Sequence, residues 1–239
     1  MIKETKTRSV LKSITWRFLA TLTTVSLVYI FTGKIDMAVE IGGIEVVLKI
    51  IIYFIHERVW YRIRFGKKEI EPFVVWFTGL PGSGKTVIAS TLARKLEEKG
   101  LKVDHLDGGN VRHIFPETGF SKEEVDQHIK RVGYLASKME KKGVFVVASF
   151  VSPYRESRNF VKELCNNFIE IYLSAPLEIC EKRESRGLYA KARAGKIKNL
   201  PGFDVTYQEP EAPELIIDTE KATIEEATDK VLKRLKKYI

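Results

Sequence analysis

The sequence predicts an α/β protein, in which a parallel sheet has helices on both faces and a lid, preceded by an all-α transmembrane helical hairpin. Three observations support this. A glycine-rich motif lies between a strand-like and a helix-like segment, residues 73–239 alternate strands with helices, and residues 1–70 hold two long apolar stretches. Strands that alternate with helices form parallel sheets covered on both faces. We therefore expect two domains, residues 1–70 and 71–239.

The glycine-rich motif fits the P-loop pattern G-x-x-x-x-G-K-[ST]. It consists of Gly79, Leu80, Pro81, Gly82, Ser83, Gly84, Lys85 and Thr86. The apolar segment 73–78 before it reads as a buried strand, and residues 87–99 after it read as a helix. In this context backbone N–H groups and the helix N-terminus bind phosphate oxygens. Lys85 can reach the β- and γ-phosphates, and the Thr86 hydroxyl can ligate Mg²⁺. We predict a site for ATP and Mg²⁺.

The rest of the second domain follows the layout of a small P-loop kinase. Further strands are expected at residues 102–106, 144–150, 168–173 and 215–217, and helices at 121–142 and 224–237. Asp107 follows the second strand at its carboxyl end, where open α/β sheets bind ligands. Residues 183–199 are basic and read as a mobile lid. Its candidate cations for a phosphoryl group are Arg183, Arg186, Lys191 and Arg193, each of which is also compatible with a solvated surface charge.

The sequence of the first domain predicts a membrane hairpin. Residues 14–31 and 37–55 are largely apolar, and basic residues gather before and after the pair. The positive-inside rule then places both termini and the kinase domain in the cytoplasm, on a multi-pass protein of the inner membrane. Membrane contact is expected over residues 14–55. The alternative is a soluble or surface-lying hairpin, which the charges of Glu40, Glu45 and Lys49 favour.

Composition excludes several classes of function. The net charge is +9, but residues 1–70 carry 12 Lys and Arg against 6 Asp and Glu, so the basicity lies mainly in the hairpin. This pattern indicates a membrane surface, and the sequence has no nucleic-acid-binding motif. Cys165 and Cys180 have neither the number nor the spacing of a disulfide framework or a zinc site.

Five ordered motifs in residues 73–239 resemble the adenylylsulfate kinase family. They are Gly79–Thr86, Leu106–His113, Gly119–Ser121, Phe150–Arg155 and Gly187–Gly195. Residues 1–70 resemble, less specifically, a two-helix membrane domain of unknown function that occurs fused to such kinases. The resemblance implies transfer of the γ-phosphoryl group of ATP to the 3′-hydroxyl of adenylylsulfate, in sulfate assimilation. Related kinases are commonly dimers, so a homo-oligomer is expected.

The resemblance also implies roles for individual residues. Lys85, Asp107 and Ser152 would be catalytic, Thr86 and Asp107 would hold Mg²⁺, and Arg183 and Arg193 would join the P-loop in binding ATP. The substrate contacts would be Asp107, Arg112, Phe120, His128, Ser152, Pro153, Lys191 and Leu200. Ser152 matches a serine assigned in the family to a phosphoserine intermediate. We interpret it as a substrate contact, because in-line transfer to a hydroxyl needs no covalent enzyme intermediate.

Four positions depart from the family pattern, and all lie on the acceptor side. Gly109 stands where the family has an acidic residue, Val125 replaces an arginine, His128 an asparagine and Leu200 an aromatic residue. The loss of a charge-assisted contact weakens binding by roughly 1.5–3 kcal/mol. The loss of a general base lowers the rate about 10²–10⁴-fold.

Three interpretations follow from these departures. The protein is a membrane-tethered adenylylsulfate kinase, a kinase for another nucleotide-linked acceptor, or a catalytically inactive nucleotide-binding membrane module. The intact Lys85, Thr86 and lid argue against the third. Restoring the family residues with Gly109→Asp and Val125→Arg separates the first two, since only the first predicts a gain of activity on adenylylsulfate.

Overall fold

A computed structural model describes residues 2–4, 6–30, 38–63, 65, 67–114 and 119–239. Residues 112 and 113 and several residues of the first seventy are described by their backbone alone. The chain divides into two compact units, Met1–Ile70 and Glu71–Ile239. We describe each unit by itself.

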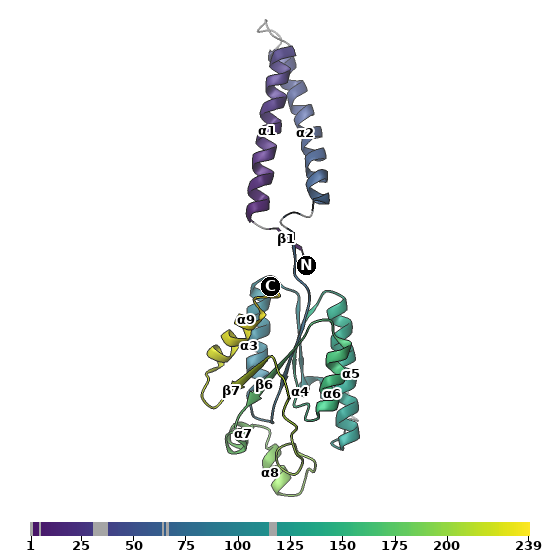
Figure 1. Ribbon diagram of the computed structural model, residues 1–239, viewed down its shortest axis with the longest axis vertical. Coiled ribbons are helices and arrows are strands. Elements are labelled where there is room, and N and C mark those ends of the chain that lie inside the picture. The colour runs from purple at the N-terminus through teal and green to yellow at the C-terminus, as the bar shows by residue number, and fades with distance from the viewer. Residues whose placement is uncertain (1, 5, 31–37, 64, 66, 115–118) are drawn as a thin grey trace. The chain divides into compact units, whose positions relative to one another are not determined.

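The N-terminal unit is a helical hairpin (Figure 1). Its elements are β1 (Ile2–Glu4), α1 (Lys6–Ile30), α2 (Ala38–Arg62) and β2 (Lys67–Glu69). β1 pairs with β2 in antiparallel fashion. Trp16 packs edge-to-face on Tyr53, with 4.9 Å between the ring centroids, and Lys12 forms an ion pair with Glu57 at 3.0 Å. Aromatic and charged contacts thus join the two helices.

The two helices differ from the spans expected for residues 14–31 and 37–55. Within the described ranges, no helix is both long enough and apolar enough to cross a membrane. Charged residues lie along both helices, among them Arg17 on α1 and Lys49 on α2. The side chains of Glu40 and Glu45 lie outside the described residues.

The second unit is a five-stranded parallel sheet in the order β4-β5-β3-β6-β7. Its strands are β3 (Val74–Thr78), β4 (Val103–Asp107), β5 (Phe145–Ser149), β6 (Phe168–Ser174) and β7 (Leu215–Asp218). Every residue of β3 and β5 is buried, as expected for apolar strands covered on both faces. All five strands coincide with segments that the sequence predicts, and the parallel α/β fold is confirmed.

Helices cover both faces of this sheet. They are α3 (Lys85–Glu98), α4 (Gly108–Ile114), α5 (Lys122–Lys141), α6 (Arg155–Leu164), α7 (Leu177–Arg183), α8 (Leu188–Arg193) and α9 (Ile224–Leu235). α3 packs against α9 on one face and α5 against α6 on the other (Figure 1). α3, α5 and α9 were expected from the sequence, whereas α4, α6, α7 and α8 are short helices that the sequence analysis did not assign.

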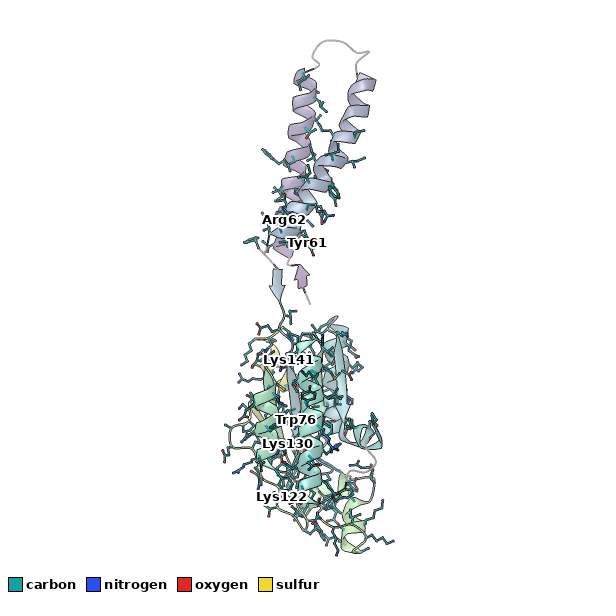
Figure 2. All side chains as sticks on the ribbon, turned by 90° about the vertical axis from the view of Figure 1, so that its right-hand side faces the viewer. Tyr61, Arg62, Trp76, Lys122, Lys130 and Lys141 are labelled. Atoms are coloured by element: carbon teal, nitrogen blue, oxygen red, sulfur yellow. The ribbon has the colours of Figure 1, made fainter. Side chains whose placement is uncertain are left out.

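α5 illustrates how local sequence sets an element. Ser121 caps the helix through the backbone N–H of Glu124, whose carboxylate accepts a hydrogen bond from the Ser121 N–H. This reciprocal pair is a capping box. Lys122, Lys130 and Lys141 lie along α5 in the view of Figure 2, and Trp76 of β3 is fully buried in the core. α5 therefore presents charged side chains of both signs on its outer surface and covers the sheet with its apolar side.

Candidate active site

The P-loop runs from the end of β3 to the first turn of α3. Gly82 has a φ of 82°, and a Cβ atom there would lie 2.1 Å from the carbonyl oxygen of Cys180 on α7. Position 82 therefore requires glycine for both its backbone conformation and its close packing. The expected loop between strand and helix is present, and α7 packs directly against it.

Lys85 is buried at the start of α3, and its ammonium group lies over the loop. Nζ donates to the carbonyl oxygens of Gly79 at 3.0 Å and Leu80 at 2.7 Å, and lies 3.3 Å from the Ser83 hydroxyl. Burial lowers the pKa of Lys85 to about 7, because desolvation disfavours the charged form. Its partners are neutral dipoles, so an anionic group in the loop would stabilise the ammonium form further.

Asp107 ends β4 beside the P-loop helix. Its Oδ2 accepts hydrogen bonds from the Thr86 hydroxyl at 2.7 Å and the Ser149 hydroxyl at 2.9 Å, and Oδ1 accepts from the Gly109 N–H at 2.9 Å. Partial burial raises the pKa of Asp107, but these hydrogen bonds and one from the Asn110 N–H outweigh it and lower the pKa below its usual value. Asp107 is therefore a carboxylate at neutral pH.

Thr86 and Asp107 form an oxygen donor set that fits Mg²⁺. The described residues contain no group of three His, Cys, Asp or Glu side chains able to hold a metal. Mg²⁺ in kinases is typically held by one or two protein oxygens together with substrate phosphates and water. The pair of Thr86 and Asp107 beside a phosphate loop meets that requirement.

The lid packs on the P-loop through an apolar cluster. Its buried members are Cys180, Tyr189, Ala192 and Leu200, with Leu80 packed against them. The Tyr189 hydroxyl donates to the carbonyl of Pro81 at 2.9 Å. Leu200, which the sequence analysis assigned to the substrate, lies in this cluster and is buried. The lid is thus anchored to the loop at its centre.

The lid cations have protein partners in this structure. Arg193 forms a two-point ion pair with Glu181, both distances being 2.8 Å, and Arg183 donates to the carbonyl of Thr219 at 3.0 Å. Lys191 is exposed and donates to the carbonyl of Arg186 at 3.2 Å. Arg183 and Arg193 thus contact protein groups in this structure, and their expected role in binding ATP stays a prediction.

Arg186 is the lid cation that lies near the reactive centre. A Cβ atom on Gly109 would lie 3.6 Å from Nη1 of Arg186 and 3.0 Å from Oδ1 of Asp107. The positive charge of Arg186 also contributes to lowering the pKa of Lys85, after burial. From the sequence, Arg186 is only one of several lid charges, because its proximity to position 109 arises only in the fold.

The acceptor-side residues lie in different environments. Phe120 is exposed, whereas His128 is buried on α5 with its ring centroid 6.2 Å from that of Phe150. Pro153 is buried, and the side chain of Arg112 lies outside the described residues. The expected roles of these residues as substrate contacts stay predictions.

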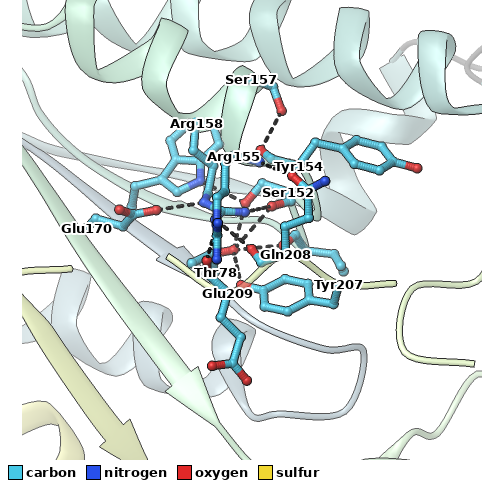
Figure 3. Close-up of polar contacts among 12 residues, drawn as sticks. Thr78, Ser152, Tyr154, Arg155, Ser157, Arg158, Glu170, Tyr207, Gln208 and Glu209 are labelled. Atoms are coloured by element: carbon cyan, nitrogen blue, oxygen red, sulfur yellow. Dashed lines mark hydrogen bonds and ion pairs between the residues drawn. The ribbon is translucent and has the colours of Figure 1, made fainter. Parts of the chain in front are cut away.

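Ser152 lies in a buried hydrogen-bond network (Figure 3). Its hydroxyl accepts from Nε1 of Trp76 at 3.0 Å and donates to the Thr78 hydroxyl at 2.9 Å. The Tyr207 hydroxyl lies 2.7 Å from the same Thr78 oxygen. The Ser152 hydroxyl is thus engaged by protein groups and only 1% of the residue is exposed.

A cavity of about 710 Å³ opens beside the other flank of the P-loop. It lies at the carboxyl ends of β6 and β7 under segment 202–207, and Leu80, Tyr172 and Tyr207 are among the residues that line it. Neither Lys85 nor Asp107 lines this cavity. No local sequence pattern indicates this cavity, because its walls come from segments far apart in the chain.

The family comparisons divide the chain as follows. Residues 71–218 match the family described as adenylylsulphate kinase, and residues 10–61 match a family described as a predicted membrane protein. A curated adenylyl-sulfate kinase of Halothermothrix orenii is 46% identical over 162 residues, which cover 67% of this chain and 88% of that protein. The relative therefore has little length beyond the kinase unit.

Two solved structures are similar to the second unit. An APS kinase of Mycobacterium tuberculosis in complex with AMPPNP and APS is 36% identical with a TM-score of 0.66, and the match covers 70% of this chain and 99% of that one. A hexameric APS kinase of Thiobacillus denitrificans is 30% identical with a TM-score of 0.54, over 75% of this chain and 31% of that one.

Proposed function

The chain belongs to the adenylylsulphate kinase family and is a phosphotransferase, and from this premise we propose that it moves the γ-phosphoryl group of ATP to the 3′-hydroxyl of adenylylsulfate. One observation carries the proposal. Thr86 bonds to Asp107 at 2.7 Å at the start of the P-loop helix, next to the buried Lys85. A phosphate loop, a cation and two oxygen donors thus meet at one place, as phosphoryl transfer requires.

We assign the donor-side roles from this geometry. Lys85 would exchange its contacts with the Gly79 and Leu80 carbonyls for the phosphates of ATP, and Arg186 would neutralise charge that develops on the transferred group. Thr86 and Asp107 would hold Mg²⁺, which when bound supplies charge neutralisation of the phosphates. Such electrostatic and positioning effects provide most of the catalysis in phosphoryl transfer.

On the acceptor side we assign roles to fewer residues than the sequence indicated. Asp107 would orient the acceptor hydroxyl without a second carboxylate, because residue 109 is glycine. The exposed Phe120 would stack on the adenine of the acceptor. Ser152 would position the site rather than form a covalent intermediate, since its hydroxyl is buried and bonded to Trp76 and Thr78.

Turnover of the purified full chain tests the proposal. ADP formation would be followed with Mg²⁺ and ATP, in the presence and absence of adenylylsulfate, and the product would be examined by mass spectrometry. We expect ADP release to depend on adenylylsulfate and to match the amount of 3′-phosphorylated product. ATP binding without turnover would refute the proposed reaction, and a panel of other nucleotide-linked acceptors would then be tested.

For the N-terminal unit we propose attachment to the cytoplasmic membrane, with both termini and the kinase unit in the cytoplasm. The match to a family of predicted membrane proteins supports this. So does the number of large apolar side chains that are at least half exposed, among them Ile14 and Phe18 on α1 and Ile50, Phe54 and Tyr61 on α2. Exposed apolar surface of this extent is typical of a membrane or protein contact.

Fractionation tests the attachment. We expect the full chain to sediment with membranes after carbonate washing and the fragment 71–239 to stay soluble, and a soluble full chain would contradict the proposal. A cysteine introduced at residue 33 distinguishes two arrangements. Labelling by an impermeant maleimide from outside the cell indicates a hairpin that crosses the bilayer, and protection indicates one that lies in the cytoplasmic interface.

We also propose that the chain is a homo-oligomer. The hexameric relative supports self-association within the family. Light scattering of the detergent-solubilised full chain measures the mass of the particle, and a mass equal to one chain would contradict the proposal.

A further inference from the structure

A buried arginine on α6 joins three other segments of the kinase unit (Figure 3). Nε of Arg158 donates to Glu170 on β6 at 2.7 Å, Nη1 to the Ser152 carbonyl at 2.6 Å and Nη2 to the Gln208 carbonyl at 2.7 Å. The Arg158 side chain is only 2% exposed. Each guanidinium nitrogen thus serves a different segment, an arrangement that the single ammonium group of lysine cannot reproduce.

Two of these segments are in turn bonded to the strand that carries the P-loop. The hydroxyls of Ser152 and Tyr207 lie 2.9 Å and 2.7 Å from the hydroxyl of Thr78, the residue directly before Gly79. Ser152 also has a φ of 38°, in the left-handed region that residues other than glycine rarely adopt. Such a conformation persists only where the surroundings hold it, and Arg158 holds the Ser152 carbonyl.

The same segments lead to the reactive groups. Ser152 follows β5, whose Ser149 donates to Asp107 at 2.9 Å. On the other side, the Gln208 N–H donates to the Pro153 carbonyl at 2.9 Å, which ties segment 206–209 to the loop after β5. A shift of either segment would therefore change the surroundings of Asp107.

We propose that Arg158 and Glu170 are positioning residues for phosphoryl transfer, which hold Ser152 and segment 206–209 against the P-loop strand and thereby fix the acceptor side relative to Asp107. Neither residue touches the reacting groups. The inference rests on the proposed reaction for its kinetic consequences, but its structural part can be tested without turnover.

Arg158→Lys is the decisive variant, because it keeps the positive charge and removes the three-way contact. We expect kcat to fall about tenfold or more and KM for adenylylsulfate to rise, since misplacement by ~1 Å costs up to about 10²-fold. Binding of a non-hydrolysable ATP analogue should change little, because the P-loop is also held by Gly82 and α7. Hydrogen exchange should accelerate at residues 151–154 and 206–209.

Two further variants keep the test interpretable. Val231→Ala removes buried volume in α9, away from this network, and serves as a control for a general loss of stability. Glu170→Gln keeps an acceptor for Nε of Arg158 at nearly the same volume, and it should show the same kinetic pattern more weakly. It replaces Arg158→Lys as the test if that variant fails to fold.

Two results would overturn the inference. One is equal kinetic damage in Arg158→Lys and Val231→Ala at matched melting temperatures. The other is unchanged hydrogen exchange at residues 206–209 in Arg158→Lys. Absence of turnover in the unaltered protein would instead refute the proposed reaction, and the exchange measurement would still decide whether Arg158 holds these segments.

Discussion

The donor side and the acceptor side of this site are built in different ways. Most of the proposed donor side is one continuous stretch, Gly79–Thr86, which Asp107 joins from β4 and Arg186 from the lid. The proposed acceptor side is assembled from the loop after β5, from α5 and from segments 187–200 and 206–209. A continuous motif tolerates change in its surroundings, whereas an assembled wall depends on the residues that hold its parts together.

Removal of the Asp107 carboxylate should have the largest effect, because Asp107 is the point where the two sides meet. We expect Asp107→Asn to lower kcat about 10²–10⁴-fold and to weaken the dependence of activity on Mg²⁺. Steady-state kinetics across a Mg²⁺ titration measures both. Asp104→Asn, on the exposed side of the same strand, is the matched control, and an equal loss in that variant would argue against a special role for Asp107.

Lys85 tests the donor side alone. Lys85→Met should lower kcat about 10²–10³-fold, as expected when one preorganised electrostatic contact is lost, and should leave the affinity for adenylylsulfate nearly unchanged. Lys95→Met on the same helix, which removes the ion pair of Lys95 with Asp229, is the control. A large rise of the adenylylsulfate Kd in Lys85→Met would show that the two sides are not separable.

The pH dependence of nucleotide binding sharpens the same distinction. The pKa of Lys85 is about 7 without ligand, and phosphate charge raises it, so binding takes up a proton above that pH. The affinity for the ATP analogue should therefore fall by up to about tenfold per pH unit above 7. Calorimetry in buffers of different ionisation enthalpy measures the proton uptake, which should disappear in Lys85→Met.

The same shift has a consequence for stability. Between pH 7 and the usual pKa of lysine, the unfolded chain binds more protons at Lys85 than the folded chain does. The free energy of unfolding of the ligand-free protein should therefore gain a contribution from Lys85 that rises with pH in this window. Urea unfolding of the wild type and of Lys85→Met at several pH values isolates it.

Restoring the family residue at position 109 should have the smallest effect on activity. It tests whether the acceptor side tolerates its departures from the family pattern. Gly109→Asp places a carboxylate near Asp107 and Arg186, and we expect KM for adenylylsulfate to change by about tenfold, the lower end of the range for one charge-assisted contact. Gly109→Asn separates charge from crowding, because its Cβ would also lie 3.0 Å from Asp107 Oδ1. A gain in both variants would show that size rather than charge matters.

The sequence predicted the donor side closely. The P-loop pattern and the flanking strand and helix depend on residues a few positions apart, so their geometry follows from local rules. The order of motifs also predicted the family. The expected pair of membrane spans was not predicted as closely. Helices over those stretches are present, but no described helix is both long enough and apolar enough to cross a membrane.

The acceptor side shows what only the tertiary structure decided. Thr78 and Tyr207 are separated by 129 residues and Arg158 and Gln208 by 50, so no local pattern reveals their contacts. The sequence motif indicates Ser152 as a substrate contact, yet the fold buries its hydroxyl between Trp76 and Thr78. By itself the sequence determined where phosphate binds, because a backbone loop and a helix start suffice for that. The packing of distant segments decided which side chains remain open to the acceptor, because burial and hydrogen bonding depend on neighbours that only the fold supplies.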